Sequence, residues 1–343
     1  MKKLHVFVII LVVFLSGCTA NESAETPTAN YVGLVTSVYA DSLPSTLYEG
    51  DQLFLQLQVE NQGDYDVESG NYWMNIKGIN PDAFKGLVED DLTKTSGTKL
   101  FSLGDFGNDT IVRGQEVFTI GNTFMYCNDI DNDLSLNLHA KSCYDYGTTS
   151  EISACFIKST ATGGDEVCLV SEFKPVTNSI APLAITEIAE SVAGSSAVRF
   201  RVKVENLGKG TVFDKYAETD IPTTLSKCDT LRRDQENVVY IESITLDGNP
   251  MNLDYEGGVE QLDNGRDRFR LDSTGAGRFS FTTITTGLDF VGNVEIKLSY
   301  GYSETDIFRT TIQALSDFQP SCSSSGTSTN GGGSGNSGSS ETI

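Results

Sequence analysis

The cysteine near the start of the sequence is the residue whose setting points most directly to a chemical modification. Lys2 and Lys3 precede an almost unbroken apolar run at 4–14, and the small residues Ser16 and Gly17 lead to Cys18. A basic start, an apolar stretch and small residues before a cleavage point are the three parts of a secretory signal. This arrangement predicts an exported chain in which the thiol of Cys18 can be acylated.

The segment Leu15-Ser16-Gly17-Cys18 resembles the lipobox of prokaryotic lipoproteins. The resemblance implies that a diacylglyceryl group joins the Cys18 sulfur, that the bond before it is cut, and that the mature chain begins there. Residues 1–17 would then be the signal peptide and the polar segment 18–30 a tether. An uncleaved membrane anchor is disfavoured, because the run at 4–14 is shorter than the ~20 residues that a spanning helix needs. A signal peptide with an incidental cysteine stays open as the alternative.

Six further cysteines follow Cys18, and an even number of cysteines in an exported chain predicts disulfides. Four of them lie close together in sequence, and two are isolated: Cys127, Cys143, Cys155 and Cys168, then Cys228 and Cys322. Their spacings do not fit a zinc site. We favour Cys155 with Cys168, across the turn-like segment 161–165, and Cys127 with Cys143. Other pairings and free buried thiols stay open, and Cys322 is the least certain to be paired.

A short acidic run could hold a hard cation. Asp129, Asp131 and Asp133 alternate with Ile130 and Asn132, and calcium binds carboxylate and carbonyl oxygens. The match to a helix-loop-helix calcium loop ends there, because Leu134 stands where that loop needs glycine and Ala140 where it needs glutamate. A solvated acidic turn just before a strand is the preferred interpretation, with calcium as the alternative.

The sequence contains little that could act as catalytic machinery. His139 is the one histidine beyond the signal segment, and there is no Gly-x-Ser-x-Gly, His-Glu-x-x-His or phosphate-binding glycine motif. A carboxylate pair of the kind glycosidases use cannot be selected among 47 acidic residues. We therefore predict a protein that is not an enzyme and has no cofactor, calcium apart.

One glycosylation sequon lies in a loop-like setting. Asn108 begins the triplet Asn-Asp-Thr within a glycine- and aspartate-rich stretch, where a glycan would fit. Such triplets are also common by chance, so an unmodified Asn108 stays open.

The balance of charge restricts the partners. The chain has 24 basic and 47 acidic residues, a formal net charge of −23. A protein of this charge does not neutralise phosphates, so nucleic acid is excluded as a partner. It also repels anionic headgroups, which keeps the body of the protein off a membrane surface.

Two alternating segments predict half-buried strands and share a sequence. Leu53, Leu55, Leu57 and Val59 fall on one face of the first segment, and Val198, Phe200, Val202 and Val204 on one face of the second. Both continue into Val-Glu-Asn-x-Gly-x-x-x-Val, at 59–67 and 204–212. Asn and Gly at such a step are explained by a sharp turn at the end of the strand.

A second match occurs at a similar separation. Tyr144-x-Tyr146 and Tyr300-x-Tyr302 end two alternating runs, and each is followed by a short polar break and another strand-like run, at 152–157 and 307–312. The order of elements agrees, which indicates two copies of one domain. No long stretch has helical spacing.

Short strands and frequent turn signals predict an all-β fold of two tandem antiparallel β-sandwich domains. The two Val-Glu-Asn-x-Gly hairpins resemble those of the immunoglobulin-like, CARDB-like modules of bacterial and archaeal surface proteins. The resemblance implies tandem seven-stranded immunoglobulin-like sandwiches, although the antibody cysteine pair is not matched. We expect domains at 31–174 and 183–318, a linker at 175–182 and a disordered Ser/Gly-rich tail at 319–343.

These features together predict a lipid-anchored protein on the outer face of the cell membrane or envelope. Its expected role is non-catalytic, in adhesion, envelope structure or assembly, with other surface proteins or glycans as partners. The alternative is a module that binds carbohydrate or another ligand on a sheet face, for which Tyr72 and Trp73 are the one hint. An accessory subunit of a secreted hydrolase is a third possibility.

Overall fold

The computed structural model describes residues 31–102, 113–157, 168, 170, 173–194, 197–217, 228, 231–284 and 289–316. These residues belong to one compact unit that begins at Tyr31. The fold is all-β, as the sequence predicts: the described elements are strands and three short 3-10 turns, η1 (Pro81–Ala83), η2 (Glu89–Leu92) and η4 (Arg233–Gln235). Within this part of the chain, no helix has the length and apolar character needed to cross a membrane.

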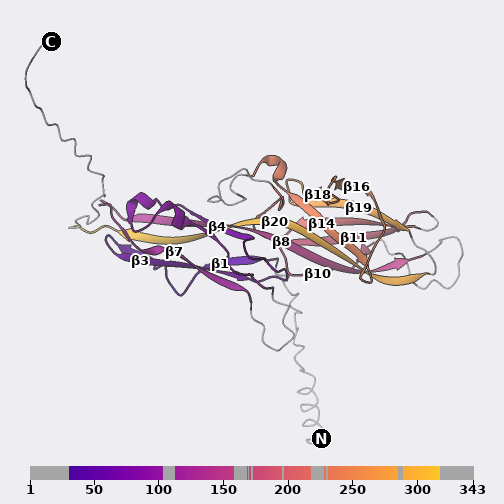
Figure 1. The fold of residues 1–343 in the computed structure, drawn as a ribbon, viewed down its shortest axis with the longest axis horizontal. Helices are drawn as coiled ribbons and strands as arrows, with labels where there is room; N and C mark the ends of the chain where they lie inside the picture. The colour runs from indigo at the N-terminus through magenta and orange to yellow at the C-terminus, as the bar shows by residue number, and fades with distance from the viewer. Residues whose placement is uncertain are drawn as a thin grey trace, which may run out of the picture. The chain divides into compact units, whose positions relative to one another are not determined.

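Three sheets make up the fold (Figure 1). The first sheet has the order β1 (Leu34–Val38), β3 (Gln52–Asn61), β7 (Gln115–Tyr126) and β5 (Phe84–Lys85). The third sheet has the order β16 (Leu253–Gly257), β19 (Ala276–Ile284), β12 (Ala197–Asn206), β11 (Leu183–Val192) and β9 (Phe173–Lys174).

The central sheet joins segments from the whole described chain. Its main path is β17 (Glu260–Gln261), β18 (Asp267–Arg270), β14 (Val238–Leu246), β20 (Phe290–Gln313), β8 (Leu134–Phe156), β4 (Tyr72–Lys77) and β6 (Thr93–Thr95). Four short strands pair beside this path: β2 (Thr46–Tyr48), β10 (Thr177–Asn178), β13 (Thr211–Phe213) and β15 (Asn249–Pro250). Strand pairs are antiparallel throughout, except that β2 runs parallel to β20.

Two unusually long strands form the middle of the central sheet. β8 has 23 residues and β20 has 24, and they pair without a register shift from Phe156 opposite Phe290 to Leu134 opposite Ile312. At about 3.3 Å per residue, such a pair extends over roughly 75 Å. Figure 1 shows both strands passing from the β3–β7 end to the β14–β19 end.

The first and third sheets cover successive stretches of the same face of this pair. Tyr72 of β4 stacks on Phe118 of β7, with ring centroids 5.7 Å apart. Further along β8, Phe156 meets Phe200 of β12 at 6.1 Å. Tyr72 lies opposite Tyr144 of β8, and Tyr144 and Phe156 are both even-numbered residues of that strand, so one face of the long strands is the floor of both apolar interiors.

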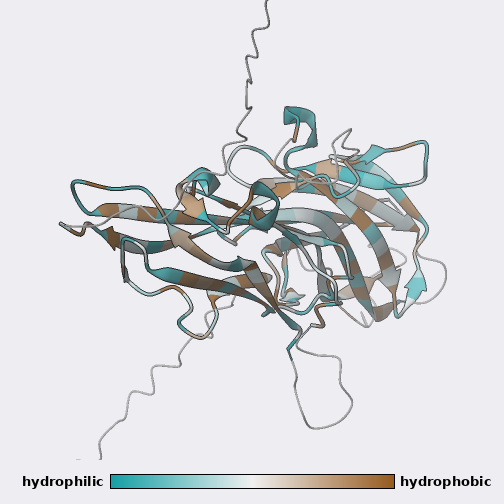
Figure 2. Cartoon of the chain, turned by 60° about the vertical axis from the view of Figure 1, so that its left-hand side comes forward, coloured by the Kyte–Doolittle hydropathy of each residue, from teal (hydrophilic) through white to brown (hydrophobic). Residues whose placement is uncertain are grey.

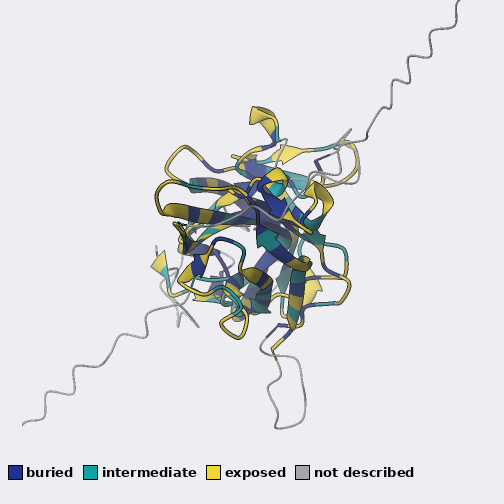
Figure 3. Ribbon diagram, turned by 90° about the vertical axis from the view of Figure 1, so that its left-hand side faces the viewer, coloured by how far each residue is buried: buried dark blue, intermediate teal, exposed yellow. Residues whose placement is uncertain are grey.

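The alternation of residue types explains which faces are buried. In β3 the leucines and Val59 that alternate with polar residues are at most 3% exposed, and in β12 the corresponding Val and Phe residues are at most 1% exposed. Figure 2 shows apolar and polar residues alternating along the strands, and Figure 3 shows buried residues alternating with exposed ones along many of the strands. The predicted core faces of these two strands are therefore confirmed.

The repeated sequence corresponds to a repeated set of hydrogen bonds. Tyr146 donates to Asn61 Oδ1 at 3.1 Å, and Tyr302 donates to Asn206 Oδ1 at 3.3 Å. Each asparagine also donates from Nδ2 to the carbonyl four residues later, at 2.8 Å in both copies. The asparagine of the repeat is thus more than a turn residue, because it ties its strand to the central sheet.

The other tyrosine of each repeat makes an equivalent contact. The hydroxyl of Tyr144 accepts from the backbone N–H of Leu34 at 3.2 Å, and that of Tyr300 accepts from Leu183 N–H at 3.3 Å. Leu34 begins β1, and Leu183 begins β11. The first described residues therefore enter the fold at the middle of β8.

The polar breaks predicted after the tyrosines are wrong. β8 and β20 continue through them as single strands. Thr148 and Ser150 are each 1% exposed, and their hydroxyls are bonded, Thr148 Oγ1 to Leu183 O at 2.9 Å and Ser150 Oγ to Asn178 Oδ1 at 2.6 Å. A buried hydroxyl with a partner costs little, so the strand need not end there.

The expected domains at 31–174 and 183–318 place β8 in one copy and β20 in the other. The segment 175–182 lies between the two copies in sequence. Hydrogen bonds along nearly the whole length of β8 and β20 nevertheless join the copies. The predicted tail at 319–343 lies outside the described residues.

Candidate functional site

Two of the predicted modification sites lie outside the described residues: Cys18 and Asn108. The cysteines further along the chain are described as far as Cys228. Cys155 bonds to Cys168, the pair that the sequence favours. Cys143 bonds to Cys228, so the predicted pair of Cys127 with Cys143 is wrong, although Cys127 is disulfide-bonded as well. Sequence proximity misled here, because β8 carries Cys143 away from Cys127 and towards the segment that contains Cys228.

The aspartate run forms an exposed turn directly before β8. Asp129, Asp131 and Asp133 are all exposed, and Asp133 Oδ1 accepts from the N–H of Ala314 at 3.2 Å. Within the described ranges, no group of three or more His, Cys, Asp or Glu residues is arranged to hold a metal ion. The nearby buried carboxylate of Glu49 instead accepts from the N–H groups of Ile130 and Leu315, each at 2.7 Å.

The remaining sequence candidates do not gather into a site. Tyr72 is fully buried, and Trp73 packs with the Cys143–Cys228 disulfide, Phe213 and Leu231. Tyr72 is therefore part of the interior, and Trp73 is partly buried against the disulfide. His139 lies opposite Lys77 and the exposed Ile307 in the central sheet, not beside a nucleophile or carboxylate in the register of that sheet.

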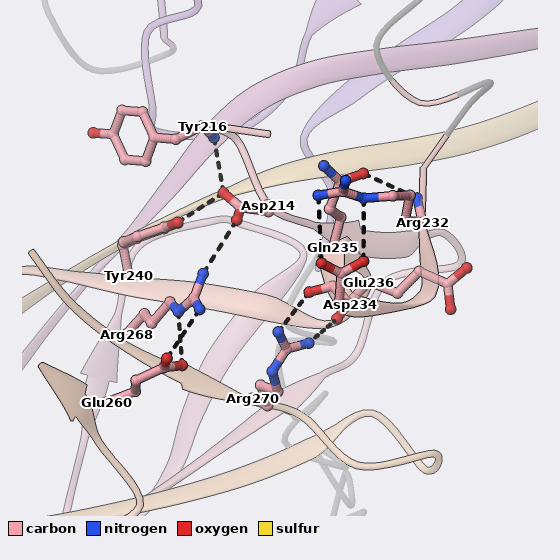
Figure 4. Close-up of polar contacts among 10 residues, drawn as sticks. All are labelled: Asp214, Tyr216, Arg232, Asp234, Gln235, Glu236, Tyr240, Glu260, Arg268 and Arg270. Carbon is pink, nitrogen blue, oxygen red and sulfur yellow. Dashed lines mark hydrogen bonds and ion pairs between the residues drawn. The ribbon is translucent and has the colours of Figure 1, made fainter. Parts of the chain in front are cut away.

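A polar cluster lies around Asp214, where β13 leads towards β14 (Figure 4). Asp214 is 7% exposed, and its Oδ1 accepts from Tyr240 Oη at 2.7 Å and from the N–H of Tyr216 at 2.9 Å. Arg268 of β18 lies 3.5 Å from Asp214 Oδ2 and forms two shorter bonds to Glu260, at 2.9 and 3.1 Å. The cluster joins three strands of the central sheet to the segment after β13.

The electrostatics of this cluster favour fixed protonation states. Burial, together with the hydrogen bond to Asp214, raises the pKa of Tyr240 to about 12, so its hydroxyl stays protonated at neutral pH. The hydrogen bonds from Arg268 lower the pKa of Glu260, and Glu260 in turn raises the pKa of Arg268. A general base needs a pKa near the working pH, and neither Tyr240 nor Arg268 has one.

Hydrogen bonds from β18 also hold the neighbouring turn η4. Arg270 of β18 donates to the carbonyl oxygens of Asp234 and Glu236, and the N–H of Arg232 bonds to Gln235 Oε1 at 2.9 Å (Figure 4). These bonds satisfy backbone groups of the turn rather than leaving polar atoms free for a ligand. The arrangement around Asp214 therefore positions a loop.

A groove of about 520 Å³ lies on the third sheet, on the face away from its apolar interior. The long polar side chains that line it come from three neighbouring strands: Glu187 of β11, Arg201 and Lys203 of β12, and Arg278 of β19. Ala189, Ser280 and Gly257 supply short side chains beside them, and Phe173 of β9 lies at the sheet edge with 57% of its surface exposed.

The register arranges these residues in two rows across the strands. Glu187, Lys203 and Arg278 lie opposite one another in one row, and Ala189, Arg201 and Ser280 in the next. The register shifts in β11 between Ile185 and Glu187, and in β16 between Tyr255 and Gly257. Such bulges re-aim side chains and recur beside binding sites.

The charges of the groove are only partly balanced. Lys203 pairs with Glu205 at 3.0 Å. A hydrogen bond from Thr186, then one from Lys203, lowers the pKa of Glu205, and Arg278 contributes through space. Among the described residues, Arg278 forms no ion pair, and it is exposed.

Sequence reasoning missed both the Asp214 cluster and the groove. Arg199, Arg201 and Lys203 alternate with core residues in β12, which is a signal that one face of this strand is basic in an acidic chain. Nothing in the sequence brings Arg278 or Phe173 beside it, because their strands are far away in the chain.

Comparison with known proteins gives no family. No family model matches the sequence, and no curated protein matches it. The similarity to solved structures is weak. The envelope protein VP37 from White Spot Syndrome Virus aligns at 14% identity and a TM-score of 0.21, covering 47% of this chain and 98% of VP37. The collagen adhesin CNA from S. aureus aligns at 12% identity and a TM-score of 0.09, covering 84% of this chain and 93% of the adhesin.

Proposed function

We propose that this protein is a non-catalytic surface protein, anchored by a lipid on Cys18, with a role in adhesion or envelope structure. Its body would consist of two immunoglobulin-like sandwich lobes that share β8 and β20. The lipobox-like segment at 15–18 supports the anchor, and the disulfides of the described chain support an oxidising location outside the cell.

The uninterrupted pairing of β8 with β20 is the observation that carries the structural role. A hinge between two tandem domains requires a linker that few contacts cross. Here 23 consecutive residue pairs run through the region between the copies, from Leu134 with Ile312 to Phe156 with Phe290. Bending the two lobes against each other would break this ladder, so the pair makes a stiff spacer suited to a load-bearing or display role.

The contacts at the middle of the spacer strengthen it. Rings of Tyr144 and Tyr302 lie 5.8 Å apart, and Tyr146 and Tyr300 lie 6.5 Å apart. Burial raises the pKa of all four tyrosines, so they stay neutral in this interior. The hydroxyls of Tyr144 and Tyr300 also bond to the first residues of β1 and β11, which belong to the first and third sheets.

The anchor is tested by cell fractionation of wild type and Cys18→Ala. We expect wild type in the membrane fraction, accessible to protease added to intact cells, and Cys18→Ala in the medium or the soluble fraction. Ser23→Ala, in the same tether, is the matched control and should behave as wild type. Retention of Cys18→Ala on the membrane, or protection of the wild type from external protease, would overturn the proposal.

A further inference from the structure

We infer that the groove on the third sheet binds an acidic sugar, a uronate unit of an anionic polysaccharide, with Arg278 holding the carboxylate. The inference deepens the adhesion role proposed above and rests on it only for its biological setting. The site itself stands on the geometry of β11, β12 and β19.

The cationic side of the groove stands out against the chain as a whole. The protein has a formal net charge of −23, yet Arg201, Lys203 and Arg278 lie on adjacent strands around one concavity. A carboxylate binds a guanidinium through two parallel hydrogen bonds, and such charge-assisted bonds are about twice as strong as neutral ones. Arg278 is suited to this contact, because it is exposed and the described carboxylates near it leave its guanidinium without an ion pair.

The floor of the groove leaves room for a ring. Ala189 and Ser280 have small side chains and Gly257 has none, which leaves space beside the longer side chains of Arg201 and Arg278. Gly258 continues the floor at φ +79°, and a Cβ there would meet Arg278 O at 2.2 Å. Position 258 therefore cannot carry a side chain, which keeps this edge of the groove open.

Phe173 and the polar groups suit a sugar in particular. An exposed aromatic ring at the edge of a polar site offers an apolar surface to the C–H face of a pyranose. Ser280 and the carboxylate of Glu187 can bond to sugar hydroxyls, which are donors as well as acceptors. A uronate uses the cation, the acceptors and the ring together.

An acidic peptide fits the groove less well. Extended peptides bind by adding a strand to a free sheet edge. The strands β12 and β19, which supply Arg201, Lys203 and Arg278, are paired on both sides and offer no free edge for such a strand.

The test is calorimetric titration of the purified protein with trigalacturonate at low ionic strength. Cellotriose is the neutral sugar probe and hexaglutamate the acidic peptide probe. We expect trigalacturonate to bind, with an affinity that falls as salt is added, and both other probes to bind at least tenfold more weakly.

Two variants locate the site. Arg278→Gln should weaken trigalacturonate binding about tenfold or more, since it removes a charge-assisted contact. Phe173→Ala should weaken it several-fold. Lys85→Gln, an exposed charge change on β5 of the first sheet, is the matched control and should bind as wild type. Unchanged melting temperatures confirm that the exposed substitutions leave the fold intact.

The inference is overturned if trigalacturonate does not bind at millimolar concentration, if Arg278→Gln binds it as well as wild type, or if hexaglutamate binds equally tightly. Since these titrations use soluble protein, their failure is separate from failure of the Cys18 anchor, which cell fractionation alone reports.

Discussion

Tyr146 and Tyr300 lie opposite each other in the pairing of β8 with β20, with ring centroids 6.5 Å apart. The second tyrosine of one repeat thus faces the first tyrosine of the other, because the two strands run antiparallel. Tyr144 likewise lies opposite Tyr302. The tyrosines of both repeats therefore lie side by side in the central sheet.

Loss of the Tyr146 hydroxyl should uncouple Asn61 from the central sheet. We expect Tyr146→Phe to lower the free energy of unfolding by about 1 kcal/mol, the typical net value of a buried hydrogen bond. A double-mutant cycle with Asn61→Ala, measured by urea unfolding, should give a favourable coupling energy. Tyr302→Phe should cost a similar amount, because its bond to Asn206 is equivalent. Additive effects of Tyr146→Phe and Asn61→Ala would contradict the contact.

The glycine of the first repeat cannot carry a side chain. A Cβ on Gly63 would lie 2.1 Å from Tyr146 Oη and 2.6 Å from Ile180 O. Gly63→Ala should therefore destabilise the protein by about 1–3 kcal/mol, the usual range for overpacking. Gly97→Ala is the control, because its Cβ would meet only Glu116 Oε1 at 3.6 Å. Equal melting temperatures for both variants would rule out this close approach.

Glu304 and Asp306 should make stability depend on pH. Burial is the largest effect and raises the pKa of both carboxyls, and Asp306 raises the pKa of Glu304 further. Lys209 lowers both pKa values in part, as does the backbone hydrogen bond from Thr36 for Asp306. The folded state therefore holds these protons more tightly than the unfolded chain. Their contribution to stability is fully present below the ordinary pKa of each group and is lost as the pH rises through the raised values.

Glu304→Gln removes one of these titrations. We expect its free energy of unfolding to exceed that of wild type at pH 7, and the difference to shrink near pH 3, where the wild-type carboxyl is protonated. Urea unfolding at both pH values measures this, with the exposed Glu89→Gln as control. A pH-independent difference between Glu304→Gln and wild type would refute the burial account.

The two described disulfides should contribute unequally. The Cys143–Cys228 bond spans 85 residues and the Cys155–Cys168 bond spans 13. Loop-closure entropy gives about 3 kcal/mol for a loop near 15 residues and more than 4 for one near 100. The double variant Cys143→Ala with Cys228→Ala should lose more free energy of unfolding than Cys155→Ala with Cys168→Ala. Urea unfolding of both variants measures this difference. The reverse order would indicate that native-state contacts dominate.

The sequence predicted faces of strands better than their lengths or partners. Alternation fixed which side of 53–59 and 198–204 is buried, because a period of two follows directly from strand geometry. It failed at Thr148 and Ser150, which look like a break in sequence but have buried hydrogen-bond partners on other elements. A local pattern does not show such distant partners.

Long-range pairing explains the remaining differences. The Cys143–Cys228 bond, the burial of Tyr72 and the position of Arg278 beside Lys203 all depend on which strands adjoin. Strand pairings such as β4 with β8 and β12 with β19 decide these neighbours, and a local sequence pattern contains no signal for them.

The intact mass of the mature protein, isolated from its native membranes, tests the central claim most directly. The proposal predicts a chain that begins at Cys18 and carries a diacylglyceryl group on its sulfur. A chain that still includes residues 1–17, or one that begins elsewhere and carries no lipid, would contradict it.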